Sequence, residues 1–120
     1  MEEFRLGAVE TRFAEIIWQN QPLPSRELVQ LCEKELNWKK STTYTVLKKL
    51  CDRGIFKNEG GEVTAAIPRD EFYSMQSEKF IEDSFDGSLP AFIAAFTSRK
   101  KLTEDEIAQI RRMIDSTPKD

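Results

Sequence analysis

The sequence predicts a mainly α-helical protein with a small β-hairpin, and three observations carry this prediction. Apolar residues recur at helical spacing in several separate segments of the chain. A Gly-Gly pair at 60–61 lies between two short runs rich in β-branched and aromatic residues, which is typical of a hairpin. The length of 120 residues, with 39 % hydrophobic and 32 % charged residues, corresponds to about one domain with a modest core.

The first two helices precede the most basic part of the chain. An apolar stripe at helical spacing predicts a helix over residues 7–19. Residues 20–24 contain two prolines and are expected to be an irregular break. Ser25 is a suitable N-cap for a second helix that ends near Leu36, because its hydroxyl can accept a hydrogen bond from an unpaired backbone N–H.

A third helix is expected over residues 41–53, inside the only strongly basic segment. From residue 37 to residue 58 there are six Lys or Arg residues and one acid. Gly54 is expected to end this helix as its C′ residue. The segments 55–58 and 63–68 are then the two strands of the hairpin. One face of the helix is apolar, and the opposite face is polar and basic. The apolar face holds Thr43, Val46, Leu47 and Leu50.

Three helices followed by a hairpin are the arrangement of a winged helix-turn-helix domain, to which we assign residues 1–69. The polar face of the third helix carries what a DNA major groove requires. Cations suit phosphates, and hydroxyls or small side chains suit base edges. Tyr44 either contacts a base or packs against the start of the second helix. The predicted DNA contacts are Lys39, Lys40, Ser41, Thr42, Tyr44, Thr45, Lys48, Lys49, Arg53 and Lys57.

Three further helices are expected, over residues 69–85, over 89–97 and after Thr103. The spacing of Thr103 and Glu106 is that of a capping box. These helices carry more apolar surface than so small a unit can bury alone, so we assign residues 70–120 to a helical dimerisation region. The alternative is a monomer in which they fold back onto the first domain. The predicted dimer contacts are Phe80, Ile81, Leu89, Phe92, Ile93, Phe96, Ile107, Ile110 and Ile114.

The composition argues against several classes of site. There is no His and no CxxC pair, so neither a metal site nor a cofactor is predicted. The sequence also lacks a Gly-rich phosphate loop, spaced paired carboxylates and an activated Ser or Cys, which indicates that the protein is not an enzyme. Cys32 and Cys51 are expected to be small packed thiols. With no long apolar run and no signal peptide, we expect no membrane insertion and a cytoplasmic location.

The order and spacing of these elements resemble the penicillinase-repressor family of winged-helix transcriptional repressors. The resemblance covers nearly the whole chain. It implies a homodimer that binds a palindromic double-stranded DNA operator and blocks transcription. In the resistance branch of the family, it also implies a membrane sensor protease system that leads to cleavage in the C-terminal region and release of the DNA. The matching segments are Ile17-Trp18, Trp38, residues 42–47, Arg53-Gly54, residues 87–96 and residues 102–107.

The chain departs from the family pattern at three places. Tyr44 stands where the resistance repressors commonly have Arg, and it cannot make their bidentate contact to guanine, so a different operator is expected. The family's Asn-Phe cleavage bond corresponds to Ala95-Phe96, which we take as the candidate cleavage bond. No cysteine follows Cys51, so the cysteine cluster of the copper-responsive branch is missing.

A second reading is a winged-helix adaptor or anti-regulator that binds protein and not DNA. The net charge of −3, the isoelectric point near 5.2 and the acidic tip at Glu59 and Glu62 favour this reading. Binding to DNA through phosphates would weaken steeply as the salt concentration rises, because Lys and Arg side chains release condensed counterions from the DNA when they bind. A salt titration therefore separates the two readings.

Overall fold

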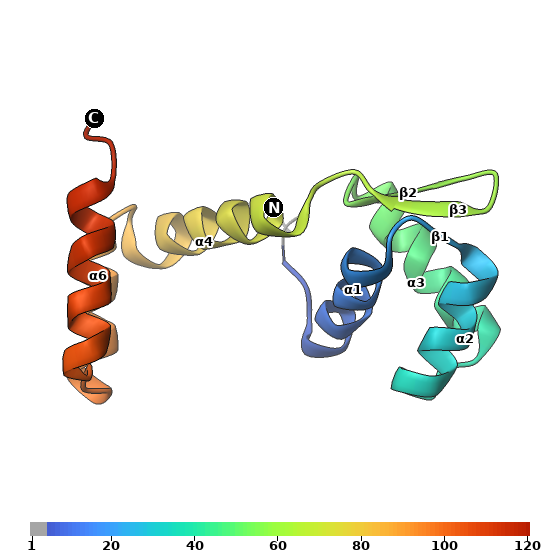
Figure 1. Cartoon of the computed structure of the whole chain (residues 1–120), viewed down its shortest axis with the longest axis horizontal. Coiled ribbons are helices and arrows are strands. Elements are labelled where there is room, and N and C mark those ends of the chain that lie inside the picture. Colours follow the sequence, from blue (N-terminus) through green and yellow to red (C-terminus); the bar gives the residue numbers. More distant parts are fainter. Residues whose placement is uncertain (1–4) are drawn as a thin grey trace. The chain divides into compact units, whose positions relative to one another are not determined.

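The computed structural model describes residues 5–120, which form six helices and one three-stranded antiparallel sheet (Figure 1). The predicted fold class, mainly α-helical with a small β-hairpin and a helical C-terminal region, is confirmed. Two compact units are present, of which the first extends to Lys79 and the second is Phe80–Asp120. Within residues 5–120, no helix has both the length and the apolar character that a membrane span needs. In chain order the elements are α1 (Ala8–Asn20), β1 (Leu23–Pro24), α2 (Ser25–Leu36), α3 (Lys40–Asp52), β2 (Phe56–Glu59), β3 (Glu62–Ala65), α4 (Arg69–Phe85), α5 (Leu89–Arg99) and α6 (Glu104–Ser116).

The hairpin after α3 is the predicted wing. β2 and β3 pair antiparallel, with Glu59 opposite Glu62, and a two-residue turn joins them. Both turn residues, Gly60 and Gly61, have positive φ angles of 60° and 85°. A type I′ turn requires positive φ at both positions, and glycine adopts it without the steric penalty of a Cβ. The Gly-Gly pair therefore sets the register of the wing.

A third strand, β1, lies where the sequence predicted only an irregular break. Leu23 pairs with Val63 and is buried, so its apolar side chain joins the core. Pro24 is tolerated because β1 is an edge strand in the order β1-β3-β2, where a missing N–H leaves no inner ladder bond unmade. The prediction that Ser25 caps α2 is wrong, because pairing with β3 keeps the chain extended through Pro24, which is the N-cap.

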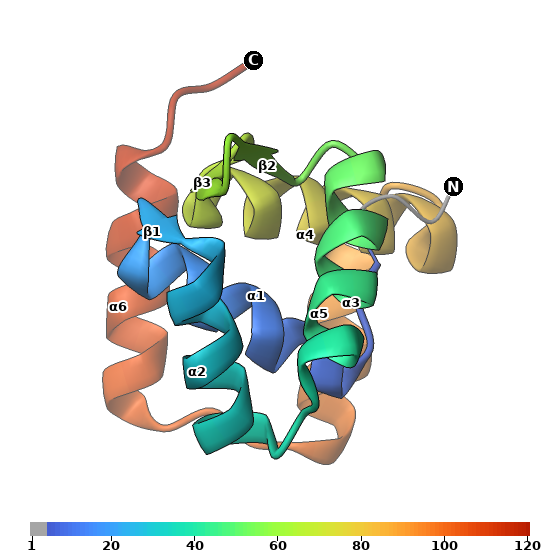
Figure 2. The same cartoon turned by 90° about the vertical axis from the view of Figure 1, so that its right-hand side faces the viewer.

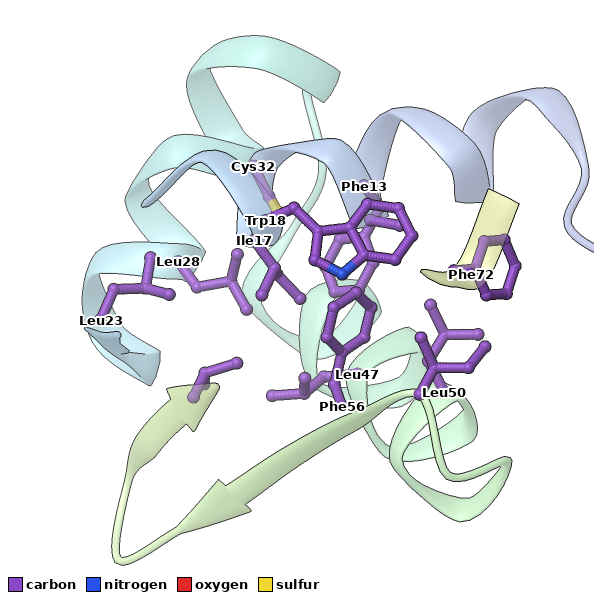
Figure 3. Close-up of a cluster of buried hydrophobic side chains, with 13 residues drawn as sticks. Phe13, Ile17, Trp18, Leu23, Leu28, Cys32, Leu47, Leu50, Phe56 and Phe72 are labelled. Carbon is purple, nitrogen blue, oxygen red and sulfur yellow. The ribbon is translucent and has the colours of Figure 1, made fainter. Parts of the chain in front are cut away.

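One hydrophobic core joins α1, α2, α3, the sheet and the start of α4 (Figure 3). The Trp18 ring lies 5.3 Å from Phe56 and 5.4 Å from Phe72, measured between ring centroids. Its indole N–H donates to the Ile67 carbonyl oxygen at 3.0 Å, which satisfies the polar edge of the ring. Burial of each large apolar side chain contributes about 1.5–3 kcal/mol, so this core fixes α3 on the domain. Its buried residues are Phe13, Ala14, Ile17, Trp18, Leu23, Leu28, Cys32, Leu47, Leu50, Ile55, Phe56, Val63 and Phe72.

The first turns of α4 are fastened to α1 by a polar cluster. The Glu15 carboxylate accepts hydrogen bonds from the Arg69 Nε at 2.9 and 3.0 Å and from the Tyr73 hydroxyl at 2.8 Å. The Arg69 guanidinium also lies over the Tyr73 ring, 5.0 Å from its centroid. Together with the buried Phe72, these contacts make the start of α4 part of the first unit.

The second unit has well-capped helices. The Ser88 hydroxyl accepts a hydrogen bond from the Ala91 N–H at 3.1 Å at the start of α5. The predicted capping box of α6 is confirmed. The Thr103 hydroxyl accepts from the Glu106 N–H at 3.1 Å, and the Glu106 carboxylate accepts from the Thr103 N–H at 2.9 Å. These caps satisfy backbone donors that the helices leave unpaired, and so they fix where α5 and α6 begin.

No side chain of the second unit is buried within a single chain. Phe80, Phe85 and Phe92 meet edge to face, with ring centroids 5.6–6.0 Å apart. Other large apolar side chains remain open to solvent, since Leu89 is 57 % exposed and Ile114 is 64 % exposed. In one chain this unit therefore has helices and an aromatic cluster without a closed core.

Candidate nucleic-acid interface

Helix α3 presents its polar face to solvent because its apolar face is fully packed. Thr43 and Leu50 are completely buried, and Leu47 is nearly so. Figure 2 shows α2 and α3 in front, with α1 behind and between them. The predicted division of α3 into a core face and an outer face is confirmed, and Thr43 is a core residue.

The end of α3 is also as predicted. Gly54 has a φ of 84° and lies one residue beyond the C-cap Arg53. Its N–H donates to the Cys51 carbonyl oxygen at 2.9 Å, and the Ile55 N–H donates to the Leu50 carbonyl oxygen at 3.1 Å. This pair of bonds is a Schellman motif, which glycine favours because it needs the left-handed conformation. The motif turns the chain from α3 directly into the wing.

The first half of α3 and the residue before it form an open polar surface. Lys39 and Lys40 make no ion pair with any residue of the described chain. Short hydroxyl side chains follow them on the same exposed face, as major-groove contact requires. We call this set the open face of α3. It consists of Lys39, Lys40, Ser41, Thr42 and Thr45, all exposed.

Tyr44 lies at the border between the open face and the core. Its side chain is half-buried, and its hydroxyl shares a 3.0 Å hydrogen bond with the hydroxyl of Ser25, the first residue of α2. The Ser25 N–H in turn donates to the Gly61 carbonyl oxygen in the wing turn at 2.7 Å. Tyr44 thus packs against the start of α2 and still borders the open face, and a chain of hydrogen bonds links α3, α2 and the wing.

Two of the predicted phosphate contacts are engaged by the N-terminal segment. The Lys49 ammonium donates to the Glu10 carboxylate at 2.6 Å, and this bond lowers the pKa of Glu10 below its usual value. The Arg53 guanidinium donates to the Arg5 carbonyl oxygen at 3.2 Å. Sequence spacing could not show these pairs, because 39 and 48 residues separate the partners. Lys49 therefore joins α3 to α1, and Arg53 joins the end of α3 to the segment that precedes α1.

Lys48 has a weaker partner. It lies 3.0 Å from Asp52 one turn along α3, and the two side chains are 77 % and 65 % exposed. An exposed pair of this kind contributes about 0.3–0.5 kcal/mol. A phosphate could therefore replace Asp52 at little cost, so Lys48 is available to DNA in a way that Lys49 is not.

The wing has an acidic tip, and a lysine lies farther back on its first strand. Glu59 and Glu62 stand opposite each other at the exposed tip, where they would repel phosphates. Lys57 lies two residues back on β2, opposite Thr64, and its side chain is exposed. Lys57, a predicted DNA contact, is thus set away from the tip.

Neither cysteine is arranged for chemistry. Cys32 is buried and Cys51 partly buried, and both thiols are free. Burial raises the pKa of both thiols, which keeps them protonated and unreactive. Within residues 5–120, no three His, Cys, Asp or Glu residues are grouped so that they could hold a metal ion. Within the first unit, the open face of α3 is therefore the surface best suited to bind a ligand.

Comparison with known proteins agrees with this arrangement. A family described as penicillinase repressor matches residues 6–116 of the chain. The penicillinase repressor of Bacillus licheniformis is 20 % identical over 115 residues, which are 92 % of this chain and 90 % of that protein. An uncharacterised 16.5 kDa protein of Latilactobacillus sakei is 23 % identical over 103 residues, or 82 % of this chain and 70 % of that protein. Since the family match spans nearly the whole sequence, the resemblance is confirmed, and the chain belongs to the penicillinase repressor family of transcriptional repressors.

Proposed function

We propose that this repressor binds a palindromic DNA operator as a homodimer, with α3 of each copy in a major groove. The observation that carries the proposal is the open face of α3, where cations and hydroxyls are exposed while the apolar face is buried. A rigid helix with such a face can place hydroxyls at base edges and ammonium groups at phosphates. In this proposal, Ser41, Thr42, Tyr44 and Thr45 contact bases.

The phosphate contacts fall into two groups by their present partners. Lys39, Lys40 and Lys57 are exposed and unpaired within the described chain, and Lys48 has only an exposed intrahelical partner. We expect these four to contribute most of the electrostatic affinity. Lys49 and Arg53 remain predicted contacts of lesser weight, because a phosphate would have to compete with the contacts that they already make.

The second unit supplies the dimer contacts in this proposal. Its helices leave large apolar side chains exposed, including Phe80 at 49 % and Phe96 at 43 %. A single chain therefore leaves this apolar surface in contact with water. A second copy of the same surface can bury it with two-fold symmetry, which is favourable. Two-fold symmetry in the protein corresponds to a palindrome in the operator. The predicted dimer residues all lie in this unit.

Release of the DNA would follow an upstream signal or proteolysis in the same unit. The candidate bond Ala95-Phe96 lies in the interior of α5, and both side chains are exposed. A protease needs an extended substrate, so cleavage there requires local opening of the helix. A cut would detach the end of α5 and all of α6 and so remove part of the proposed dimer surface. A membrane sensor protease is the partner that this route requires.

The proposed readers and phosphate contacts are tested by selecting bound DNA from random fragments and then comparing variants. Lys40→Ala should weaken binding to every sequence alike. Thr45→Ala should change which base is preferred at one operator position, by about 1–3 kcal/mol for a good base contact. Val9→Ala, on the exposed side of α1, is the control and should leave both quantities unchanged. Failure to bind any DNA at low salt would refute the proposal and favour the adaptor reading.

A further inference from the structure

We propose that Ser25 is a positioning residue that sets which base Tyr44 prefers in the operator. This inference rests on the proposed function, since it assumes that α3 reads DNA. Its basis is the 3.0 Å hydrogen bond between the Ser25 and Tyr44 hydroxyls at the edge of the open face. Ser25 therefore begins α2 and also contacts Tyr44 through its hydroxyl.

The bond restricts what the Tyr44 hydroxyl can offer to a base. A tyrosine hydroxyl has one O–H donor, and its oxygen also accepts, so a freely rotating group can pair with either a donor or an acceptor on a base edge. The bond to Ser25 holds the Tyr44 hydroxyl at one place, so the hydroxyl can meet a base edge only from one direction. Base edges in the major groove differ in their pattern of donors and acceptors. Fixing the hydroxyl thus makes Tyr44 selective where an unfixed tyrosine would be permissive.

Ser25 is itself held in place by the main chain. Its N–H donates to the Gly61 carbonyl oxygen at 2.7 Å, and it directly follows Pro24, which pairs with Glu62. Gly61 has no side chain, and a Cβ built there would lie 4.0 Å from the Ser25 Oγ. The wing turn therefore positions the Ser25 backbone, and the Ser25 side chain in turn contacts Tyr44. Through this chain of contacts the wing influences base choice without its acidic tip touching DNA.

The experiment measures the base preference of the full-length protein at each operator position, using DNA selected by the wild type. Ser25→Ala should lower the preference at one position by about 2- to 12-fold, the range for one net hydrogen bond, and leave the salt dependence of binding unchanged. Tyr44→Phe should lower the preference at the same position. The double variant should lose no more preference than the more affected single variant, because both changes remove the same hydrogen bond. Ser25→Thr keeps the hydroxyl and should restore the preference.

The matched control is Ser74→Ala, which removes an exposed serine hydroxyl on α4. It should leave every base preference unchanged. A urea melt of each variant confirms that it is folded. If Ser25→Ala lowers affinity equally for all sequences, or if the losses from Ser25→Ala and Tyr44→Phe add, the inference is wrong and Ser25 is only structural. If the wild type binds no DNA, the proposed function itself has failed, so the two failures are distinguishable.

Discussion

Replacing Thr43 with Val should stabilise the protein. Thr43 is fully buried on the inner face of α3, and its hydroxyl oxygen makes no hydrogen bond of ordinary geometry within the described chain. The polar group beside it is the Cys32 thiol, which is a weak hydrogen-bond partner. Valine has nearly the same shape as threonine and an equally branched Cβ, so the change replaces an unpaired hydroxyl with a methyl group in the same space.

The size of the effect follows from the burial. Leaving a hydroxyl without a full partner in a protein interior costs about 1–3 kcal/mol, and the weak thiol contact offsets part of this. We therefore expect Thr43→Val to raise the free energy of unfolding by about 1 kcal/mol. For a chain of this size that corresponds to an increase in Tm of roughly 3–6 °C. DNA binding should be unchanged, because residue 43 faces the core.

The assay is urea unfolding followed by circular dichroism, at one protein concentration for all variants because formation of the proposed dimer would also contribute to stability. The midpoint should rise with no change in the slope m. Thr45→Val is the matched control on the exposed face of α3, where no gain in stability is expected. A loss of more than about 1 kcal/mol in Thr43→Val would refute the reasoning, because it would mean that the hydroxyl has a strong partner.

Three further predictions follow from single contacts. Gly54→Ala should destabilise the protein by roughly 1–2 kcal/mol in urea unfolding, because Gly54 has a φ of 84°; an unchanged midpoint would contradict the Schellman assignment. Glu10→Gln should lower the urea midpoint at pH 7 and should have a smaller effect near pH 3. The pKa of Glu10 is lowered by Lys49, so the stabilisation is present above the ordinary carboxyl pKa of 4.5 and is lost as the pH falls through the lower folded value; a larger effect at pH 3 would exclude this pair as the cause. Phe92→Asp should shift the proposed dimer to monomer in sedimentation equilibrium while the helical circular dichroism signal remains, because a charge would then lie in the proposed apolar interface; a dimer that persists in this variant would place the interface elsewhere.

Much of the first unit follows from local signals in the sequence. The apolar periodicity of α3, the left-handed glycine after it and the Gly-Gly wing turn each involve residues close together in the chain. Their physical causes, side-chain spacing and glycine's access to positive φ, operate locally and can therefore be read from the sequence. The same holds for the Thr103–Glu106 capping box, whose two hydrogen bonds span three residues.

The features that sequence reasoning missed depend on contacts between distant segments. β1 forms because Leu23 reaches the far side of β3, and this pairing outweighs the local signal of two prolines. The same pairing moves the helix start and frees the Ser25 hydroxyl for Tyr44. The partners of Lys49 and Arg53 come from the other end of the domain. The helical wheel correctly places both cations outside the core, but it cannot show that α1 packs beside them.

The salt dependence of binding to a selected palindromic DNA, followed by fluorescence anisotropy, tests whether two copies hold DNA through the open face of α3. Each phosphate neutralised contributes a slope of about −0.9 to the plot of log affinity against log salt. With Lys39, Lys40, Lys48 and Lys57 on each of two copies, the slope should lie at roughly −4 to −7, and Lys40→Ala should make it shallower by about 2. No binding at low salt, or binding with a slope near zero, would contradict a dimer that holds DNA through the open face of α3.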